Sequence, residues 1–260
     1  MRILLTNDDG YHAPGLAVLE RIARTLSDDL WIVAPAEEQS GTGRSLTITR
    51  PVRVRRFDER RFAVTGTPTD AVMMALASIM DAKPDLILSG VNRGANLAED
   101  VSYSGTVSAA MEGAFAGIRS IALSQVYAVS EEDGAPGDPV SFAAADAWGE
   151  RVLRPLIDAE WAPRTTVNVN FPPVSPTQVQ GVRVVRQGLR DHGRVKIDRR
   201  TDPRGFDYSW IGLQRVPHDP KPGTDLHAIA ERYVSVTPLH LDLTHEPSLA
   251  AFGRALGVTG

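Results

Sequence analysis

The sequence predicts an α/β protein with a doubly wound, mainly parallel sheet. Short apolar runs rich in Ile, Leu and Val alternate with longer stretches that repeat an apolar residue every three or four positions. A polar loop containing Gly or Asn follows several of the apolar runs. The chain has 260 residues, of which 42% are hydrophobic and 23% charged, a composition that is sufficient for a packed core.

The first half of the chain supplies most of the predicted sheet. Four apolar runs are predicted as buried strands: residues 3–5, 30–33, 86–88 and 121–123. Three helices are predicted among them: one opened by Pro14, one opened by Thr67-Pro68-Thr69-Asp70, and one with an apolar stripe from residue 107 to residue 115. Residues 46–57 alternate apolar and polar side chains, which predicts a half-exposed strand or hairpin broken at Pro51.

The second half changes character after Pro172-Pro173. Before it we predict a surface loop at 130–139, a helix at 142–157 and a strand at 166–170; after it, exposed hairpin strands at 182–185 and 194–199, a strand at 234–236 and a helical tail at 247–256. We predict a single domain over residues 1–260, with a catalytic core at 1–175 and a hairpin and C-terminal segment at 176–260. That segment is too peripheral for the core to cover, so we expect it to pack on a partner subunit.

Composition excludes several classes of function. The net charge of −4 does not support an electropositive surface for duplex nucleic acid. The absence of cysteine excludes disulfides, thiolate metal sites and cysteine nucleophiles. The first apolar run is too short for a signal peptide, and the longest apolar stretch, residues 71–80, is shorter than the ~20 residues of a membrane span. We therefore expect a cytoplasmic protein.

Three polar loops, at residues 6–10, 37–44 and 89–104, follow predicted strands. Ligands of parallel sheets bind at the carboxyl edge of the strands, where these loops are expected to meet. The first loop carries Asp8 and Asp9, two adjacent carboxylates whose repulsion a hard divalent cation would relieve. The alternative is an ordinary turn in which Asp caps the next helix.

The third loop offers neutral ligands and an anion site. Asn92 and Asn96 have side-chain oxygens that suit Mg²⁺ or Mn²⁺, although the same residues are common in flexible loops. Ser104-Gly105-Thr106 directly precedes a predicted helix, so its amides and hydroxyls form a ready phosphate site; the alternative is a plain serine N-cap.

Several other signatures are missing. The first strand is not followed by G-x-G-x-x-G, and the sequence contains no Walker lysine motif, H-E-x-x-H or G-x-S-x-G. His12 lies near the acidic loop, where a structural or capping role is at least as well supported as a chemical one. Tyr103 is expected to be a packed aromatic residue, with flanking of a base as the alternative. Trp148, Trp161 and Phe142 are expected to belong to the core.

Taken in order, the segments MRILLTNDDG, APGL, SLTITRP, GTPTD, SGVNRGAN, YSGTVSAAMEG, NVNFP and YVSVTPL closely resemble the SurE family, the survival-protein nucleotidases of bacteria, archaea and plants. The resemblance runs over nearly the whole chain. It implies a Rossmann-like α/β core and a divalent-metal-dependent phosphatase that hydrolyses nucleoside 5′- and 3′-monophosphates. Some members also act on short polyphosphate.

The resemblance also assigns residues. It implies that Asp8, Asp9, Ser40 and Asn92 bind one Mg²⁺ or Mn²⁺ per subunit, with Asp8 and Asp9 also catalytic. It further implies that phosphate is held by four residues of the third loop: Asn96, Ser104, Gly105 and Thr106. The assembly it implies is a homodimer or homotetramer that exchanges C-terminal elements. The chain departs from the family at Gln39, where Arg is frequent, and at Ala95, where Pro is common.

Three other functions compete with this hypothesis. A phosphatase with an aspartyl phosphate intermediate would carry Asp-x-Asp rather than adjacent acids, and trapping a phosphoenzyme would support it. A nucleotide-binding module without turnover is distinguished by a phosphate-release assay with added Mn²⁺. A nicotinamide-dependent dehydrogenase is disfavoured by the missing glycine fingerprint and is tested by cofactor titration.

Overall fold

The computed structural model describes residues 1–127, 141–190, 195–213 and 219–258, and the described chain is built on a nine-stranded sheet with the order β3-β4-β2-β1-β5-β6-β7-β11-β8. The strands of this sheet are β1 (Ile3–Thr6), β2 (Leu30–Pro35), β3 (Val54–Arg56), β4 (Arg61–Val64), β5 (Leu86–Arg93), β6 (Arg119–Gln125), β7 (Thr165–Phe171), β8 (Val182–Val184) and β11 (Val234–His240). In the order of the sheet, the six strands from β4 to β7 are mutually parallel, whereas β3 pairs antiparallel with β4 and β11 pairs antiparallel with β7. The mainly parallel sheet predicted from the sequence is therefore confirmed.

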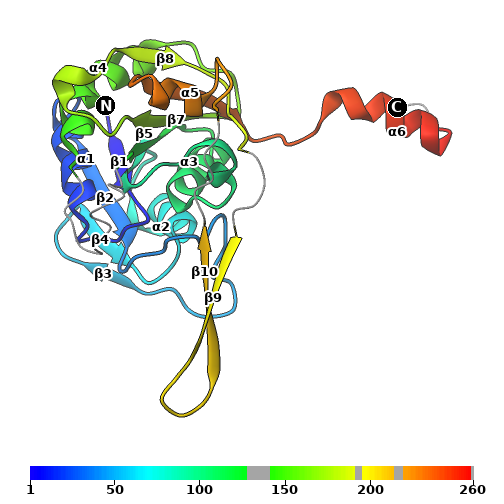
Figure 1. Ribbon diagram of the computed structural model, residues 1–260. Coiled ribbons are helices and arrows are strands. Elements are labelled where there is room, and N and C mark those ends of the chain that lie inside the picture. The colour runs from blue at the N-terminus through cyan, green and yellow to red at the C-terminus, as the bar shows by residue number, and fades with distance from the viewer. Residues whose placement is uncertain (128–140, 191–194, 214–218, 259–260) are drawn as a thin grey trace.

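Helices cover both faces of the sheet (Figure 1). The helices are α1 (Pro14–Arg24), α2 (Pro68–Met74), α3 (Gly105–Phe115), α4 (Ala143–Asp158), α5 (Asp225–Ala230) and α6 (Glu246–Leu256), with short turns at Ala75–Ile79, Ala98–Ser102 and Pro176–Gln178. One core cluster joins α1 and α4 to the sheet, and two others lie on the opposite face with α2 and α3. This two-sided packing is the doubly wound arrangement.

The start of α2 follows from its sequence. Thr67 is the N-cap and accepts a hydrogen bond from the amide of Asp70 at 3.1 Å, while the Asp70 carboxylate accepts one from the amide of Thr67 at 2.8 Å. Pro68 occupies the first helical position, where no amide is needed. The helix start predicted from these four residues is confirmed.

Residues 46–57 differ from the prediction. Only residues 54–56 form a strand, β3, and Leu46 and Ile48 lie outside any strand with 48% and 85% of their surface exposed. Alternation alone predicted a strand there, but the described residues leave about half of Leu46 and most of Ile48 uncovered. β3 pairs with β4, a strand that was not predicted from the sequence. Trp148, Trp161 and Phe142 are partly buried and pack against the core cluster on the side of α1 and α4, as expected.

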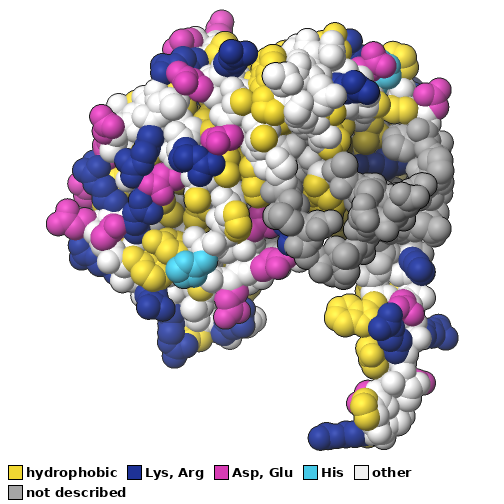
Figure 2. Space-filling model, turned by 60° about the vertical axis from the view of Figure 1, so that its left-hand side comes forward, with side chains coloured by type: hydrophobic (Ala, Val, Ile, Leu, Met, Phe, Trp, Pro, Cys, Tyr) yellow, Lys and Arg dark blue, Asp and Glu magenta, His cyan; other side chains and the backbone are white. Residues whose placement is uncertain are grey.

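The region beyond residue 175 is divided between the main sheet and two projections. β8 pairs in parallel with β11 at the edge of the main sheet, so Val182 and Val184 are exposed, as predicted, but the prediction that residues 182–185 belong to a hairpin was wrong. The hairpin itself is β9 (Val195–Thr201) paired with β10 (Asp207–Leu213), and it projects from the body, as does α6 (Figures 1 and 2). The loop predicted at 130–139 lies outside the described residues.

A boundary at residue 175 between the predicted core and the C-terminal segment would fall between two hydrogen-bonded strands. β7 lies before residue 175, β11 lies after it, and the two strands pair in the main sheet. Among the described helices, none has the length and apolar character that a bilayer crossing requires.

Candidate metal and phosphate site

The three polar loops meet at the carboxyl edge of the sheet, as predicted. The backbone oxygen of Asp8, directly after β1, accepts a hydrogen bond from the amide of Gln39 at 2.8 Å, which joins the first loop to the second. The Asp9 carboxylate accepts one from the amide of Arg93 at 2.9 Å, which joins the first loop to the third. The convergence follows from the parallel pairing of β1 with both β2 and β5.

Asp8 is buried against the start of α3. One of its carboxylate oxygens accepts a hydrogen bond from the Thr106 hydroxyl at 2.5 Å, and only 5% of the residue is exposed. A Cβ placed on Gly105 would lie 2.8 Å from Asp8 Cβ and 3.1 Å from its Oδ2. Glycine at this position is therefore what allows the helix to approach the carboxylate so closely.

The two carboxylates are costly to ionise together. Burial raises the pKa of Asp8 to about 7; the hydrogen bond from Thr106 opposes this shift, and the negative charges of Asp9 and Glu38 add to it. Burial also raises the pKa of Asp9, against the hydrogen bond from the Arg93 amide. A divalent cation held between the two carboxylates would remove this cost, so the donor set fits a hard metal ion.

The remaining metal ligands would be neutral oxygens. Within the described residues, no group of three or more His, Cys, Asp or Glu side chains could hold a metal. Asn92 follows a shift in the register between β5 and β6. Its side-chain nitrogen donates to the backbone oxygen of Gly94 at 3.0 Å, and its side-chain oxygen, which would be the metal ligand, is not used in that hydrogen bond. Ser40 is exposed on the second loop, and its hydroxyl donates to Glu38 at 2.8 Å, which leaves its lone pairs available.

At the start of α3, Ser104-Gly105-Thr106 forms both structures that the sequence allowed: a serine N-cap and a helix start that can bind an anion. Ser104 is the N-cap and accepts a hydrogen bond from the amide of Val107 at 3.0 Å. The amides of Gly105 and Thr106 open the helix and have no intrahelical acceptor, so they can bind an anion. The Thr106 hydroxyl donates its proton to Asp8, and any contact of this residue with phosphate would therefore come from its backbone amide.

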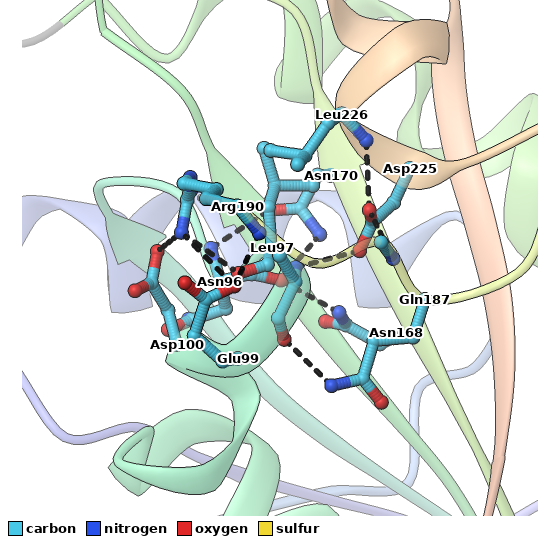
Figure 3. Close-up of polar contacts among 12 residues, drawn as sticks. Asn96, Leu97, Glu99, Asp100, Asn168, Asn170, Gln187, Arg190, Asp225 and Leu226 are labelled. Atoms are coloured by element: carbon cyan, nitrogen blue, oxygen red, sulfur yellow. Dashed lines mark hydrogen bonds and ion pairs between the residues drawn. The ribbon is translucent and has the colours of Figure 1, made fainter. Parts of the chain in front are cut away.

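Asn96 is the centre of a buried network (Figure 3). Its side-chain nitrogen donates to the hydroxyl of Ser124 at 2.8 Å and, over a longer 3.3 Å, to that of Thr106. Its backbone amide donates to the side-chain oxygen of Asn170 at 2.9 Å. Its backbone oxygen accepts hydrogen bonds from Asn168 at 2.7 Å and Asn170 at 3.0 Å. Both backbone groups of Asn96 are thus fixed by side chains of β7.

The residues after Asn96 are held by the C-terminal part of the chain. The fully buried Asp225 accepts hydrogen bonds from the amides of Ala98 and Gly188, both at 2.8 Å, and Gln187 donates to the Ala98 oxygen at 2.8 Å. Arg190 forms an ion pair with Asp100 at 2.6 Å (Figure 3). Ala98 has a φ of 54°, a left-handed conformation that these contacts hold in place.

Sequence analysis did not identify Asn168, Asn170 and Asp225. The signal for the two asparagines was present, because polar Thr166, Asn168 and Asn170 alternate with apolar residues in a strand that is buried on both faces. Tyr103 is the opposite case: 66% of its surface is exposed, so the prediction of a packed aromatic was wrong. Tyr103 lies between the turn at Ala98–Ser102 and the N-cap of α3, and the described residues leave most of its side chain uncovered.

Comparison with known proteins places these observations in a family. Residues 3–194 match the family described as Survival protein SurE. A protein of Rhizorhabdus wittichii named 5′-nucleotidase SurE is 70% identical over 96% of this chain and 98% of its own length, and a protein of the same name from Erythrobacter litoralis is 58% identical over 98% and 99%. The crystal structure of the SurE protein from Aquifex aeolicus, 36% identical, covers 98% of this chain and 100% of its own with a TM-score of 0.82.

Proposed function

This chain belongs to the SurE family and is a 5′-nucleotidase, and from that premise we propose that it hydrolyses nucleoside 5′- and 3′-monophosphates with the help of one Mg²⁺ or Mn²⁺ ion per subunit. The observation that carries the proposal is a pair of adjacent carboxylates, of which the buried Asp8 lies directly against the anion-binding start of α3 and the half-buried Asp9 accepts a hydrogen bond from the third loop. A metal ion and a phosphate would be neighbours in such a site. Activity on short polyphosphate is part of the same proposal.

In this proposal Asp8, Asp9, Asn92 and Ser40 hold the ion. When bound, it supplies positive charge to the phosphoryl group and lowers the pKa of a nearby water molecule. Thr106 donates to one oxygen of Asp8, which orients the carboxylate and leaves its other oxygen for the ion.

The phosphate is held by groups of the third loop and α3. The amides of Gly105 and Thr106 and the side chains of Ser104 and Asn96 would bind its oxygens and stabilise the charge that develops as the bond from phosphorus to the ribose oxygen breaks. The Asn96 hydrogen bond to Thr106 is the longer of its two, at 3.3 Å, and is the one that a phosphate oxygen can replace. Asp8 or Asp9 orients the attacking water, and the products are nucleoside and phosphate.

The test is phosphate release from a panel of 5′- and 3′-monophosphates and tripolyphosphate, with Mg²⁺, Mn²⁺ or chelator. We expect chelation to abolish turnover, and Asp8→Asn to reduce it at least about 100-fold and to weaken Mn²⁺ binding in calorimetry. Asp28→Asn, an exposed carboxylate that precedes β2 at the opposite edge of the sheet, is the matched control. Full turnover by folded Asp8→Asn, or by the chelated protein, would refute the proposal.

Two of the competing functions are tested in the same experiment. A phosphoenzyme trapped on Asp8 or Asp9 would replace the proposed mechanism with an aspartyl phosphate pathway. Nucleotide binding without phosphate release under any metal would identify a binding module.

We also propose that the chain forms a homodimer or homotetramer that exchanges C-terminal elements. Two projecting elements support this. Both elements extend away from the body of the molecule (Figure 1). The hairpin of β9 and β10 exposes 63% of Trp210 and 77% of Ile211, and α6 exposes 65% of Phe252. Large apolar side chains gathered on projecting elements are typical of surfaces that another subunit covers. The cytoplasmic location expected from the sequence stays a prediction.

A further inference from the structure

The loop that follows Asn92 has no regular structure of its own before the turn at Ala98–Ser102. A loop residue that must present its side chain to a phosphate needs its backbone fixed, because ordering a free loop on binding lowers the affinity. Asn96 is fixed in an unusual way. Its backbone amide and its backbone oxygen are both hydrogen-bonded to side chains of β7 rather than to the backbone of a neighbouring segment.

From this arrangement we infer that Asn170, assisted by Asn168, is a positioning residue for phosphate binding, because it holds the backbone of Asn96. The inference rests on the proposed function, in which Asn96 contacts the phosphate. Asn170 makes two hydrogen bonds with the backbone of Asn96, as acceptor at 2.9 Å and as donor at 3.0 Å (Figure 3). A carboxamide is the side chain that can do both at once.

The location of Asn170 excludes a simpler role in sheet stability. It is fully buried on β7, where an apolar residue would pack without the cost of desolvating an amide. Its neighbours along the strand, Val169 and Phe171, belong to the hydrophobic core on the other face. The polar side chain is therefore turned toward the site, and within the described part of the chain its hydrogen bonds go to Asn96 and offset the cost of its burial.

The bonds to Asn96 continue to the carboxylates. The Asn96 side chain is hydrogen-bonded to Thr106, and Thr106 to Asp8. A single chain of contacts thus leads from the middle of β7 to the metal site. Because Asn170 acts through Asn96, its loss is expected to weaken phosphate binding more than it slows the chemical step.

The test compares Asn170→Ala with Thr166→Val in the full-length protein. Thr166 lies on the same strand and the same face, is fully buried, and donates to the Ser120 oxygen at 2.7 Å, so its loss removes a comparable buried hydrogen bond away from Asn96. Each variant is assayed for KM and kcat with nucleoside monophosphate and for the affinity of orthophosphate by calorimetry with Mg²⁺. Thermal unfolding monitored by circular dichroism verifies folding.

We expect Asn170→Ala to raise KM and to weaken orthophosphate binding by about tenfold or more, with kcat changed less than about threefold, and Thr166→Val to change neither. In an Asn96→Ala background, Asn170→Ala should have no further effect on KM, because the side chain that Asn170 positions for phosphate binding has been removed. If Asn170→Ala fails to fold, Asn168→Ala is the second variant. It removes one of the two hydrogen bonds to the Asn96 oxygen, the one that Asn168 donates at 2.7 Å, and is expected to act in the same direction.

Two results would overturn the inference: orthophosphate affinity in Asn170→Ala equal to that in Thr166→Val, or effects of Asn170→Ala and Asn96→Ala on KM that are fully additive. Both can occur in a chain that hydrolyses nucleotides normally, so they are separate from failure of the proposed function. If the wild-type chain released no phosphate from any nucleotide, the proposed activity would fail, and the orthophosphate titration would still decide the role of Asn170.

Discussion

Substituting Gly105 by alanine tests whether the close approach of α3 to Asp8 matters. The new methyl carbon would lie 2.8 Å from Asp8 Cβ and 3.1 Å from both Asp8 Oδ2 and Pro68 Cγ. Ordinary contacts of a Cβ begin near 3.4 Å, so Asp8 or the helix must move by about 0.6 Å. The same methyl would also crowd Pro68, so we expect the carboxylate to be displaced.

Two effects of opposite sign act on stability. Alanine is a better helix former than glycine by about 1 kcal/mol in a helix interior, and by less in the first turn. Overpacking of a tight contact costs about 1–3 kcal/mol. The second effect is larger, so we expect a net loss of about 1–2 kcal/mol in the free energy of unfolding. A carboxylate displaced by about half an ångström should also lower kcat/KM by about 10- to 100-fold.

The assay measures urea unfolding together with phosphate release at several Mn²⁺ concentrations. Gly212→Ala on β10 is the matched control, because the nearest atom to its new methyl would be 3.7 Å away. The reasoning would be refuted if Gly105→Ala were more stable than the wild type and turned over substrate at the wild-type rate, since the methyl group would then have met open space.

Two further predictions concern the capping box and α6. Burial alone would raise the pKa of Asp70, but hydrogen bonds from Thr47 and Thr67 outweigh it and lower the pKa below the ordinary 3.8; its stabilisation is therefore present above about pH 4 and is lost as the pH falls below 3.8. Asp70→Asn should cost about 1–3 kcal/mol at pH 7, and the gap to the wild type should narrow toward pH 3 in urea titrations; a gap that is constant with pH would contradict this. Phe252→Ser in α6 should shift the chain to a smaller species in light scattering at micromolar concentration, whereas Arg254→Gln on the opposite face should not; a wild-type chain that is already monomeric would contradict the assignment.

The network around Asn96 gives the C-terminal half of the chain a role beyond assembly. Arg190 and Asp225 lie on either side of the projecting hairpin in the sequence, and both hold the short segment that follows Asn96. Described residues that precede and follow the hairpin in the sequence thus hold the same segment of the third loop.

Local chemistry explains what could be predicted from the sequence. The capping box of Thr67 and Asp70 involves residues three positions apart, and the apolar runs of β1, β5 and β6 carry their own burial signal. The convergence of three loops followed from the rule that parallel strands end at one edge. These features need no knowledge of a distant neighbour.

Tertiary structure decided which side chain meets which. The Thr106 hydroxyl reaches Asp8 across 98 residues, and the Asn96 amide reaches Asn170 across 74. Alternation predicted a half-exposed strand or hairpin at residues 46–57, and an aromatic side chain predicted packing at Tyr103, yet only residues 54–56 form a strand and 66% of Tyr103 is exposed. The physical reason is that the spacing of residues in a sequence specifies the direction in which a side chain points along its own helix or strand, whereas the group that it meets there is supplied by a segment far away in the chain.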